Sequence, residues 1–412
     1  MLNEAAELVR DVDELPDGWR SLRLGDVATL SGGTTPSRAE PAYWENATIP
    51  WATPSDITSL ATGANRISDT ENKVSEKALS ECSLTLNPPG TVLMTSRATI
   101  GFAAINQVPM ATNQGFITFR VGEDLNADFL LYWLTAQRSN LVAAAGGSTF
   151  KELSRGTAKL LSILVPPLGE QRRIAEVLQS VDEAIAASQA SLQQTETVLS
   201  ALSDELFSTA TSGGSNKWPQ RPLEDMLDNI IDYRGVPPPK ADSGIPLLTA
   251  KNVRFGYLDF EPREYIAEKD YDSWMRRGLP SAGDILFTTE APLGNVAEFP
   301  NIKAALGQRT LTLVPKAGVL SPKFLKWLLL SKSAQDLIWS HATGSTAKGI
   351  KQRTFRKLKF SFPIFDEQIR ISEILEDMGA AREAAKRSKE VYTKLKANLM
   401  SDLLSGRMRV PG

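Results

Sequence analysis

An internal repeat constrains this 412-residue chain more than any other feature of the sequence. When the sequence is shifted against itself by about 193 to 199 residues, matches recur in the same order in both halves. They include Trp19 with Trp218, GTVLMT with GDILFT (90–95 and 283–288), FLLYWL with FLKWLL (129–134 and 324–329), and PPLGEQRRIAEVL with PIFDEQIRISEIL (166–178 and 363–375). Because order and spacing are both kept, the sequence indicates a tandem duplication whose copies have diverged.

Each half begins with a part that mixes short β-like runs, glycine, proline and an apolar helical segment, and continues with a long polar helix. This mixture is typical of a compact α+β domain. The sequence therefore predicts an α+β fold in which an α/β recognition-type domain followed by a long helix occurs twice. The expected boundaries are 1–18 for an N-terminal segment, 19–167 for the first domain, 168–210 for the first helix, 211–217 for a linker, 218–363 for the second domain, 364–405 for the second helix and 406–412 for a tail.

The two long helices carry apolar residues in alternating steps of four and three, which is the pattern of a coiled-coil seam. In the first helix the seam is Ile174, Leu178, Val181, Ile185, Ser188, Leu192, Thr195, Leu199, Leu202 and Leu206. In the second it is Ile371, Leu375, Met378, Ala385, Tyr392, Leu395, Leu399 and Leu403. Core helices of globular domains are the alternative, but helices of about 40 residues exceed the usual length. We expect an antiparallel pair with approximate two-fold symmetry, spanning at most about 60 Å.

Composition excludes several classes of protein. The chain has 46 basic and 48 acidic residues, so bulk charge does not hold it to nucleic acid. One cysteine, Cys82, and one histidine, His341, allow neither an internal disulfide nor a Cys/His zinc cluster. The acidic N-terminal segment lacks the layout of a signal peptide, and no apolar run is long enough for a membrane span. We therefore expect a cytoplasmic protein without a metal.

A local basic segment indicates where nucleic acid would bind. No acidic residue occurs from Leu337 to Phe365, and TAKGIKQRTFRKLKF within it is rich in Lys and Arg. Gly-Ser-Thr followed by a lysine occurs in both halves, at Lys151 and at Lys348, and would offer hydroxyls and a cation to phosphate. A solvated, lysine-protected strand edge is the alternative. A P-loop is excluded because Ile350 stands where its lysine must be.

Further candidates lie in glycine- and proline-rich loops and after the central strand of each half, at Ser96-Arg97 and its counterpart Thr289-Glu290. These positions differ between the halves whereas the surrounding framework matches, as expected for a reader of two unlike half-sites, although the loops could equally be connectors. The predicted DNA-binding residues are Ser31, Thr34, Arg38, Ser96, Arg97, Asn113, Gln114, Lys151, Arg155, Lys159, Arg234, Lys251, Asn252, Arg254, Gln308, Arg309, Lys348, Lys351, Arg353 and Arg356.

The segment NPPG (87–90) approaches the Asn-Pro-Pro-aromatic corner of DNA amino-methyltransferases, with glycine in place of the aromatic residue. The repeat aligns LNPPG (86–90) with LPSAG (279–283), which keeps a proline and the glycine but not the asparagine. A turn needs Pro and Gly, whereas a catalytic corner needs Asn and an aromatic residue. No glycine-rich turn for a methyl donor is present. The sequence therefore predicts a strand-entry turn used twice and no catalytic site.

The chain resembles the specificity subunits of type I restriction–modification systems over nearly its whole length. The resemblance depends on the duplication, on W-x4-L-x-D opening each domain, on SGGTTPSR, GTVLMTSRATIG and ATNQGF, and above all on PPLGEQRRIAEVL with its echo PIFDEQIRISEIL. It implies two target-recognition domains that each read half of a split DNA sequence, separated by a helical spacer that bounds the gap at roughly 17 base pairs.

The resemblance also implies partners. Two modification subunits would carry the adenine methylation, using S-adenosylmethionine, and restriction subunits would use ATP and Mg²⁺; no cofactor is expected on this chain. The predicted partner-binding residues are Glu170, Gln171, Arg172, Arg173, Glu367, Gln368 and Arg370. A stand-alone methyltransferase or nuclease, and a two-domain scaffold that does not bind DNA, remain the alternatives.

Overall fold

The computed structural model describes residues 15–61, 63–147, 151–208, 218–233, 237–344 and 347–410. Its contacts divide the chain into two compact units. The first unit consists of Met1–Ser191 with Ala385–Gly412, and the second of Leu192–Ala384. Each unit thus contains one copy of the repeated α+β part together with segments of both long helices.

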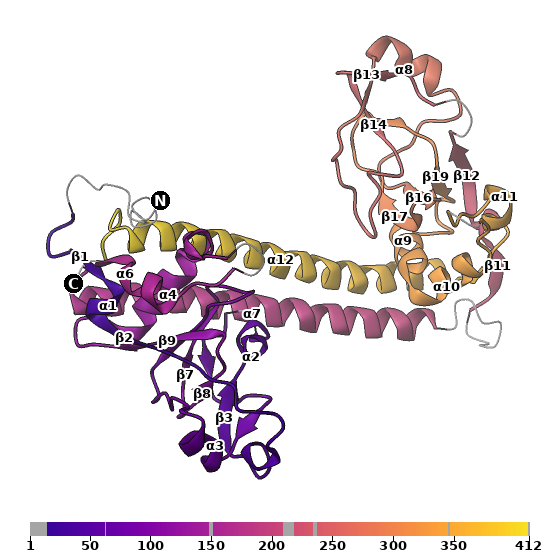
Figure 1. Ribbon diagram of the computed structural model, residues 1–412. Coiled ribbons are helices and arrows are strands. Elements are labelled where there is room, and N and C mark those ends of the chain that lie inside the picture. The colour runs from indigo at the N-terminus through magenta and orange to yellow at the C-terminus, as the bar shows by residue number, and fades with distance from the viewer. Residues whose placement is uncertain are drawn as a thin grey trace. The chain divides into compact units, whose positions relative to one another are not determined.

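A five-stranded sheet forms the centre of the first unit (Figure 1). Its strands, in spatial order, are β2 (Ala28–Gly32), β9 (Phe116–Val121), β6 (Val92–Thr95), β7 (Ala103–Asn106) and β4 (Arg66–Ile67). A smaller sheet consists of β5 (Lys73–Val74), β3 (Ile49–Ala52) and β8 (Ala111–Thr112), and β1 (Arg20–Arg23) pairs with β10 (Ser162–Val165). The short helices are α1 (Leu24–Val27), η1 (Pro41–Tyr43), α2 (Pro54–Thr58), α3 (Glu76–Glu81), α4 (Ala127–Ala136), α5 (Arg138–Ala144) and α6 (Arg155–Leu160).

The second unit repeats this plan. Its central sheet consists of β12 (Leu227–Asp232), β19 (Thr310–Pro315), β16 (Ile285–Thr289) and β17 (Leu293–Glu298), in that order. The smaller sheet has β13 (Lys240–Ala241), β15 (Tyr265–Ile266), β14 (Ile245–Leu248) and β18 (Ala305–Leu306), and β11 (Gln220–Pro222) pairs with β20 (Lys359–Ser361). Its short helices are η2 (Leu223–Met226), α8 (Glu268–Trp274), α9 (Pro322–Leu330), α10 (Lys332–Ser340) and α11 (Gln352–Phe355). The strand order β12-β19-β16-β17 matches β2-β9-β6-β7, which confirms the duplication.

The glycine that ends NPPG is one half of a matched pair of turns. Gly90 and Gly283 both have positive φ, at 86° and 94°. The N–H of Gly90 donates to the carbonyl of Asn106 at 2.8 Å, and that of Gly283 to Phe299 at 2.9 Å. Asn87 is buried, and its amide donates to the carbonyl of Met110 at 3.0 Å. The segment is therefore a strand-entry turn in both units, as its repetition predicted.

The helix α4 explains how each domain is joined to the long helices. Its six residues Phe129–Leu134 are all buried, because the helix packs on the central sheet on one side and against the first long helix on the other. A helix that is covered on all sides needs no polar face. In the equivalent helix α9 the matching stretch Phe324–Leu329 contains one charged residue, Lys326, which is nevertheless buried.

The long helices are α7 (Leu168–Phe207) and α12 (Phe365–Leu404), each of 40 residues. In the first unit the start of α7 shares a core with the end of α12, where Leu178 and Leu403 belong to one cluster. In the second unit Leu199 of α7 shares a core with Leu375 near the start of α12. The two helices therefore run antiparallel within each unit, and none of the ten predicted seam residues of α7 is exposed.

The prediction of the α12 seam is wrong at one residue, Leu395. Leu395 is 41% exposed, whereas its neighbour Lys396 turns inward and pairs with the buried Asp182 of α7 at 2.5 Å. The buried aspartate requires a cation opposite it, and this requirement sets which of two adjacent residues faces α7. The residues of α12 that are shielded from solvent at alternating steps of four and three are Ile371, Leu375, Met378, Arg382, Ala385, Lys389, Tyr392, Lys396, Leu399 and Leu403.

Candidate nucleic-acid interface

A hollow of about 670 Å³ opens in the first unit where the central strand β6 ends. Buried Ser96 lies at its floor, and Arg97, Gln114 and Arg155 lie around it. Gly33 also lines the hollow. Only glycine fits at this position, because a Cβ there would lie 2.0 Å from the carbonyl oxygen of Asn113. The first unit thus brings together side chains from four separate parts of its sequence.

The second unit has a hollow of about 500 Å³ at the corresponding place, at the end of β16. Thr289, Glu290, Gln308, Arg309 and Lys351 lie around it. The backbone is built in the same way: Arg97 and Gly146 both form bridges to Glu152, as Glu290 and Thr343 do to Gly349. We name these two features the first and the second readout hollow.

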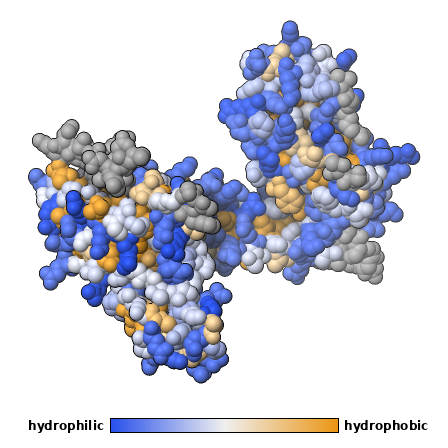
Figure 2. Space-filling model, in the orientation of Figure 1, coloured by the Kyte–Doolittle hydropathy of each residue, from blue (hydrophilic) through white to orange (hydrophobic). Residues whose placement is uncertain are grey.

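Cations without an ion-pair partner among the described residues occur in the segments next to both hollows, and three of them, Arg155, Lys159 and Lys351, line a hollow directly. The first unit supplies Lys151, Arg155 and Lys159, and the second supplies Lys348, Lys351, Arg353, Lys357 and Lys359; all are exposed. In the second unit they lie on and beside α11, where the visible surface is hydrophilic (Figure 2). Exposed cations that no carboxylate neutralises are suited to phosphate groups.

The structure contradicts one predicted DNA contact outright. Asn252 is 2% exposed, and its amide is fully used: the oxygen accepts from the N–H of Thr249 at 2.9 Å, and the nitrogen donates to the carbonyl oxygens of Asp259 and Pro262. The prediction is wrong because this asparagine fixes a loop, a role that the sequence does not distinguish from base reading.

Several other predicted residues already have structural partners. Arg254 makes two bonds to one carboxylate oxygen of Asp259, at 3.2 and 3.1 Å, and Arg356 pairs with Glu224. The guanidinium of Arg38 stacks 3.6 Å from the ring centroid of Trp44. The side-chain oxygen of Asn113 accepts from the N–H of Gly115 at 2.8 Å. Arg38, Asn113 and Arg254 hold loops in shape, whereas Arg356 lies beside the unpaired Lys357 but has its own charge already paired.

Three more predicted residues lie in loops or strands outside the cationic clusters. Ser31 lies in β2 opposite Thr118 and is half-buried, and the N–H of Thr34 donates to Thr112 at 3.0 Å. Lys251 is exposed, 3.9 Å from a carboxylate oxygen of Glu264. Arg234 lies outside the described residues.

Sequence reasoning missed Glu152, and it named Glu290 as a candidate but left it out of the predicted DNA-binding residues, although both carboxylates lie in the readout hollows. Glu152 forms an ion pair with Arg97, whose Nε is 2.9 Å from the nearer carboxylate oxygen. Glu290 pairs with Arg309 at the same distance. The alignment of the repeats, which places Glu290 on Arg97, pointed to Glu290, whereas nothing in the sequence singles out Glu152.

The predicted partner-binding residues at the start of each long helix mostly hold that helix to its own domain. Gln171 donates to the carbonyl oxygens of Asp124 and Pro166, and Gln368 does the same with Val319 and Pro363. Both glutamines are buried, so their assignment to partner binding is wrong. These hydrogen bonds from the side-chain amide explain why a glutamine occurs at this position in both copies.

Glu170 is likewise wrong as a partner contact. It is 3% exposed, accepts from the indole of Trp19, and forms an ion pair with Arg409, which holds the pKa of its carboxyl below the usual range. Its counterpart Glu367 accepts from Trp218 at 3.3 Å. Arg173 donates to the carbonyl of Val410. Only two of the seven residues are exposed without a partner among the described residues: Arg172 and Arg370.

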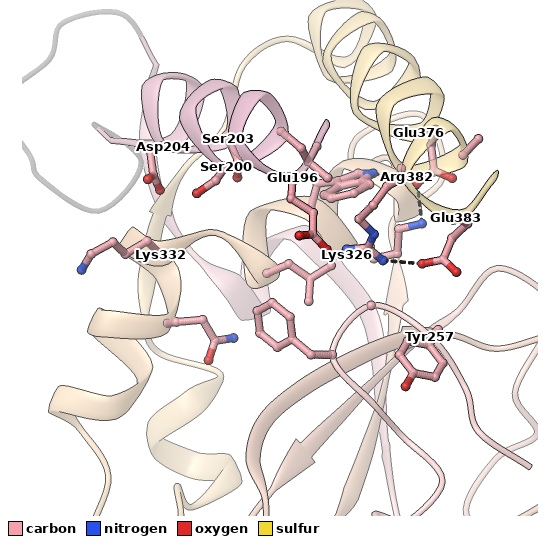
Figure 3. Close-up of a pocket in the computed structure, with 18 residues that line it drawn as sticks. Glu196, Ser200, Ser203, Asp204, Tyr257, Lys326, Lys332, Glu376, Arg382 and Glu383 are labelled. Carbon is pink, nitrogen blue, oxygen red and sulfur yellow. Dashed lines mark hydrogen bonds and ion pairs between the residues drawn. The ribbon is translucent and has the colours of Figure 1, made fainter. Parts of the chain in front are cut away.

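A third hollow, of about 760 Å³, lies in the second unit between the end of α7, the start of α12, α9 and the loop at Phe255-Gly256-Tyr257 (Figure 3). Glu196 of α7 and Arg382 and Glu383 of α12 gather on one side of it. Phe255 and Tyr257 are about half exposed, at 51% and 52%. We name it the helix-side hollow.

A metal site and a membrane-spanning helix are both lacking from the part of the chain that the structure describes. There, no group of three or more His, Cys, Asp and Glu side chains is arranged to hold a metal ion. No helix in the same ranges is long and apolar enough to cross a membrane.

Comparison with known proteins identifies relatives over most of the chain. The family described as type I restriction modification DNA specificity domain matches residues 16–197 and 278–392. The MjaIX type I restriction enzyme specificity subunit of Methanocaldococcus jannaschii is 38% identical over 177 residues, which is 42% of this chain and 40% of that protein. The EcoKI specificity subunit of Escherichia coli is 22% identical over 396 residues, covering 89% of this chain and 83% of that one. The match to the first of these relatives therefore spans less than half of its length.

Solved structures show the same fold. The crystal structure of the type I restriction–modification S subunit from M. genitalium matches with a TM-score of 0.62 at 14% identity, over 95% of this chain and 98% of that one. A chain from a study of complex assembly and conformational transition of the type I system matches with a TM-score of 0.55 at 19% identity, over 96% of this chain and all of that one. The family match covers well over half of the sequence and both copies of the repeat. The chain belongs to the family of type I restriction–modification DNA specificity domains.

Proposed function

We propose that this chain is the DNA specificity subunit of a type I restriction–modification complex. Each of its two units reads one half of a gapped DNA target through its readout hollow. The observation that carries the proposal is the matched pair of hollows, which share a backbone framework but differ in their exposed side chains. Base readout needs variable side chains on a constant support.

Phosphate contacts come from the unpaired cations beside each hollow. The chain carries a formal net charge of −2, so its attraction to DNA has to be local. The unpaired cations of α11 and its flanks, with Arg353 and Lys357 among them, provide such a local charge in the second unit. They set the register on the duplex, and the hollows supply sequence preference.

The chain itself performs no chemistry on this proposal. Two modification subunits bring adenine methylation with S-adenosylmethionine, and restriction subunits, where present, use ATP and Mg²⁺; the complex works in the cytoplasm. Large apolar side chains exposed on the long helices, namely Val198, Ile374, Val391 and Leu395, support docking of partner chains there. The helix spacer then sets the gap between the half-targets.

The proposal is tested by charge reversal in the assembled complex. Lys348→Glu with Lys351→Glu should lower DNA affinity at least tenfold and reduce the slope of log K against log salt by about 2, since each phosphate contact contributes about 0.9. Assembly with the modification subunits should be unchanged. The matched control is Lys269→Glu with Lys323→Glu, which removes equal charge from exposed positions on α8 and α9.

The alternatives give different results in the same assay. A scaffold that does not bind DNA predicts no salt-sensitive binding by the wild-type complex. A stand-alone methyltransferase predicts that the purified chain methylates DNA with the methyl donor alone. Equal affinity of the Lys348/Lys351 variant and the control would contradict the assigned phosphate contacts.

A further inference from the structure

Each readout hollow contains an exposed arginine–glutamate ion pair, but the arginine and the glutamate occupy different sequence positions in the two units. The repeat aligns Arg97 with Glu290, so one position carries a guanidinium in the first unit and a carboxylate in the second. In the first unit the carboxylate comes from Glu152, on the segment that returns to the central strand. In the second unit the guanidinium comes from Arg309, on the loop that leads into β19. The arginine is therefore attached at a different point in each hollow.

Stability does not explain these pairs. All four side chains are 43% to 57% exposed, and ion pairs of that exposure contribute about 0 to 1 kcal/mol to folding. A pair of this kind does restrict the arginine side chain, whose free rotamers would otherwise be lost on binding. A guanidinium that is already oriented and still exposed is prepared for a ligand.

Backbone conformation at Arg309 gives a second, independent indication. Its φ is 67°, in the left-handed region that side chains with a Cβ rarely adopt. The carbonyl of Arg309 accepts from the N–H of Thr289 at 2.9 Å and from its hydroxyl at 3.2 Å, which holds the loop in this shape. In the first unit the matching bond, from the N–H of Ser96 at 2.7 Å, goes to a glycine, Gly115. The φ of Gly115 is not positive, so the strained backbone belongs to the arginine of the second unit alone, and strain of this kind is typical of functional sites.

We propose that Arg97 and Arg309 each read a guanine, one in each half of the DNA target, and that Glu152 and Glu290 position them. The inference rests on the proposed function. Arginine is suited to this role because its planar fork of N–H donors matches the O6 and N7 acceptors of guanine in the major groove. Since the two arginines are attached at different points, the guanines occupy different places within the two half-targets.

The test uses the chain co-expressed with its modification subunits in a host that lacks other adenine methylation, with modified bases read by sequencing. Arg97→Gln should lower the preference for guanine about 10- to 100-fold at one position of one half-target and leave the other half unchanged. Arg309→Gln should do the same in the other half. The control Arg20→Gln removes an arginine of similar exposure, paired with Asp124 at 3.1 Å, and should not change the motif.

A second measurement covers variants that fail to fold or assemble. Wild-type complex is bound to targets in which each guanine of the motif is replaced in turn by 7-deazaguanine, which lacks the N7 acceptor. One guanine in each half should weaken binding about tenfold or more, and Arg97→Gln or Arg309→Gln complex should no longer distinguish it.

Variants of the two glutamates test whether their carboxylates position the arginines or read a base themselves. Glu152→Gln and Glu290→Gln should weaken binding while the preferred base stays guanine, whereas a glutamate that itself reads cytosine would change the preferred base. A motif without guanine in either half, or unchanged guanine preference in both arginine variants, overturns the inference. A wild-type chain that produces no gapped methylation motif overturns the proposed function instead.

Discussion

At equivalent places along the helices, the first unit buries an aspartate and the second unit has a glycine. Asp182 of α7 accepts from the hydroxyl of Tyr132 at 2.8 Å and from the amide of Asn65, and pairs with Lys396 of α12. Gly63 lies against the backbone of α7 beside it. In the first unit, therefore, a loop of the recognition domain covers this place, and a network of polar groups closes it.

At the equivalent place in the second unit, α12 packs against the recognition domain through a glycine and an indole. Gly379 leaves room for the indole of Trp327, which aligns with Tyr132 and would lie 3.1 Å from a Cβ on the glycine. The indole donates to Glu376 at 2.7 Å, and Glu376 also pairs with the buried Lys326. The loop at Phe255-Gly256-Tyr257 borders this place without filling it, and the helix-side hollow lies there (Figure 3). Duplicated frameworks can therefore keep their backbone while one copy closes a surface that the other leaves open.

The largest effect is expected where the first unit buries its charge. Asp182→Ala leaves the ammonium of Lys396 and the hydroxyl of Tyr132 without their acceptor, and breaking a buried pair in this way costs about 3–5 kcal/mol of folding free energy. Urea unfolding followed in the complete chain measures it. Glu183→Ala, one residue on and exposed, is the control and should change stability little. A loss below about 1 kcal/mol for Asp182→Ala would mean that the network does not close the first unit.

An intermediate effect is expected at the glycine of the second unit. Gly379→Leu should destabilise the chain by about 1–3 kcal/mol, because the added side chain has to displace Trp327 from its packed position. The control Ala381→Leu, two residues on and exposed, should be neutral. Gly379→Leu that is as stable as this control would show that Trp327 does not need the glycine.

The smallest effect is the pH dependence that comes from Tyr132 of the first unit. Burial, and then the Asp182 carboxylate, raise the pKa of Tyr132 well above its usual value of about 10. Below about pH 10 the phenol keeps its proton in both the folded and the unfolded chain, so this group gives no pH dependence. As the pH rises further, only the unfolded chain loses the proton, and stability should fall by about 1.4 kcal/mol per pH unit.

Tyr132→Phe removes that contribution. The difference in unfolding free energy between wild type and this variant should therefore change between pH 10 and pH 11, in the direction that weakens the wild type. Stability curves of the two proteins that stay parallel over this range would contradict the buried position of the phenol.

Much of the fold could be predicted because it depends on features that are local or repeated. The duplication, the α+β parts, the long helices and the paired turns at Gly90 and Gly283 all follow from spacing and residue type. The seam of α7 followed from periodicity alone, since most of its residues are apolar. Leu395 was wrongly assigned to the seam of α12, where the structure has the next residue, Lys396. Lys396 faces α7 because it pairs with the buried Asp182, which is more than 200 residues away in the sequence.

Site residues were harder to predict for a related reason. The sequence marks polar residues in loops, but it does not say whether a side chain is already used. Asn252 and Gln171 look like readers or contacts, yet both side chains are buried and donate to backbone carbonyls of a neighbouring loop. Glu152 and Glu290 are common exposed residues whose importance depends on the arginine opposite them.

We propose that this chain decides which adenines its complex methylates. Sequencing of modified bases in a host with and without the gene, in the presence of the modification subunits, tests it most directly. We expect a gapped motif with two specific halves to carry N6-methyladenine only when the gene is present. An unchanged methylation pattern after its removal would contradict the claim.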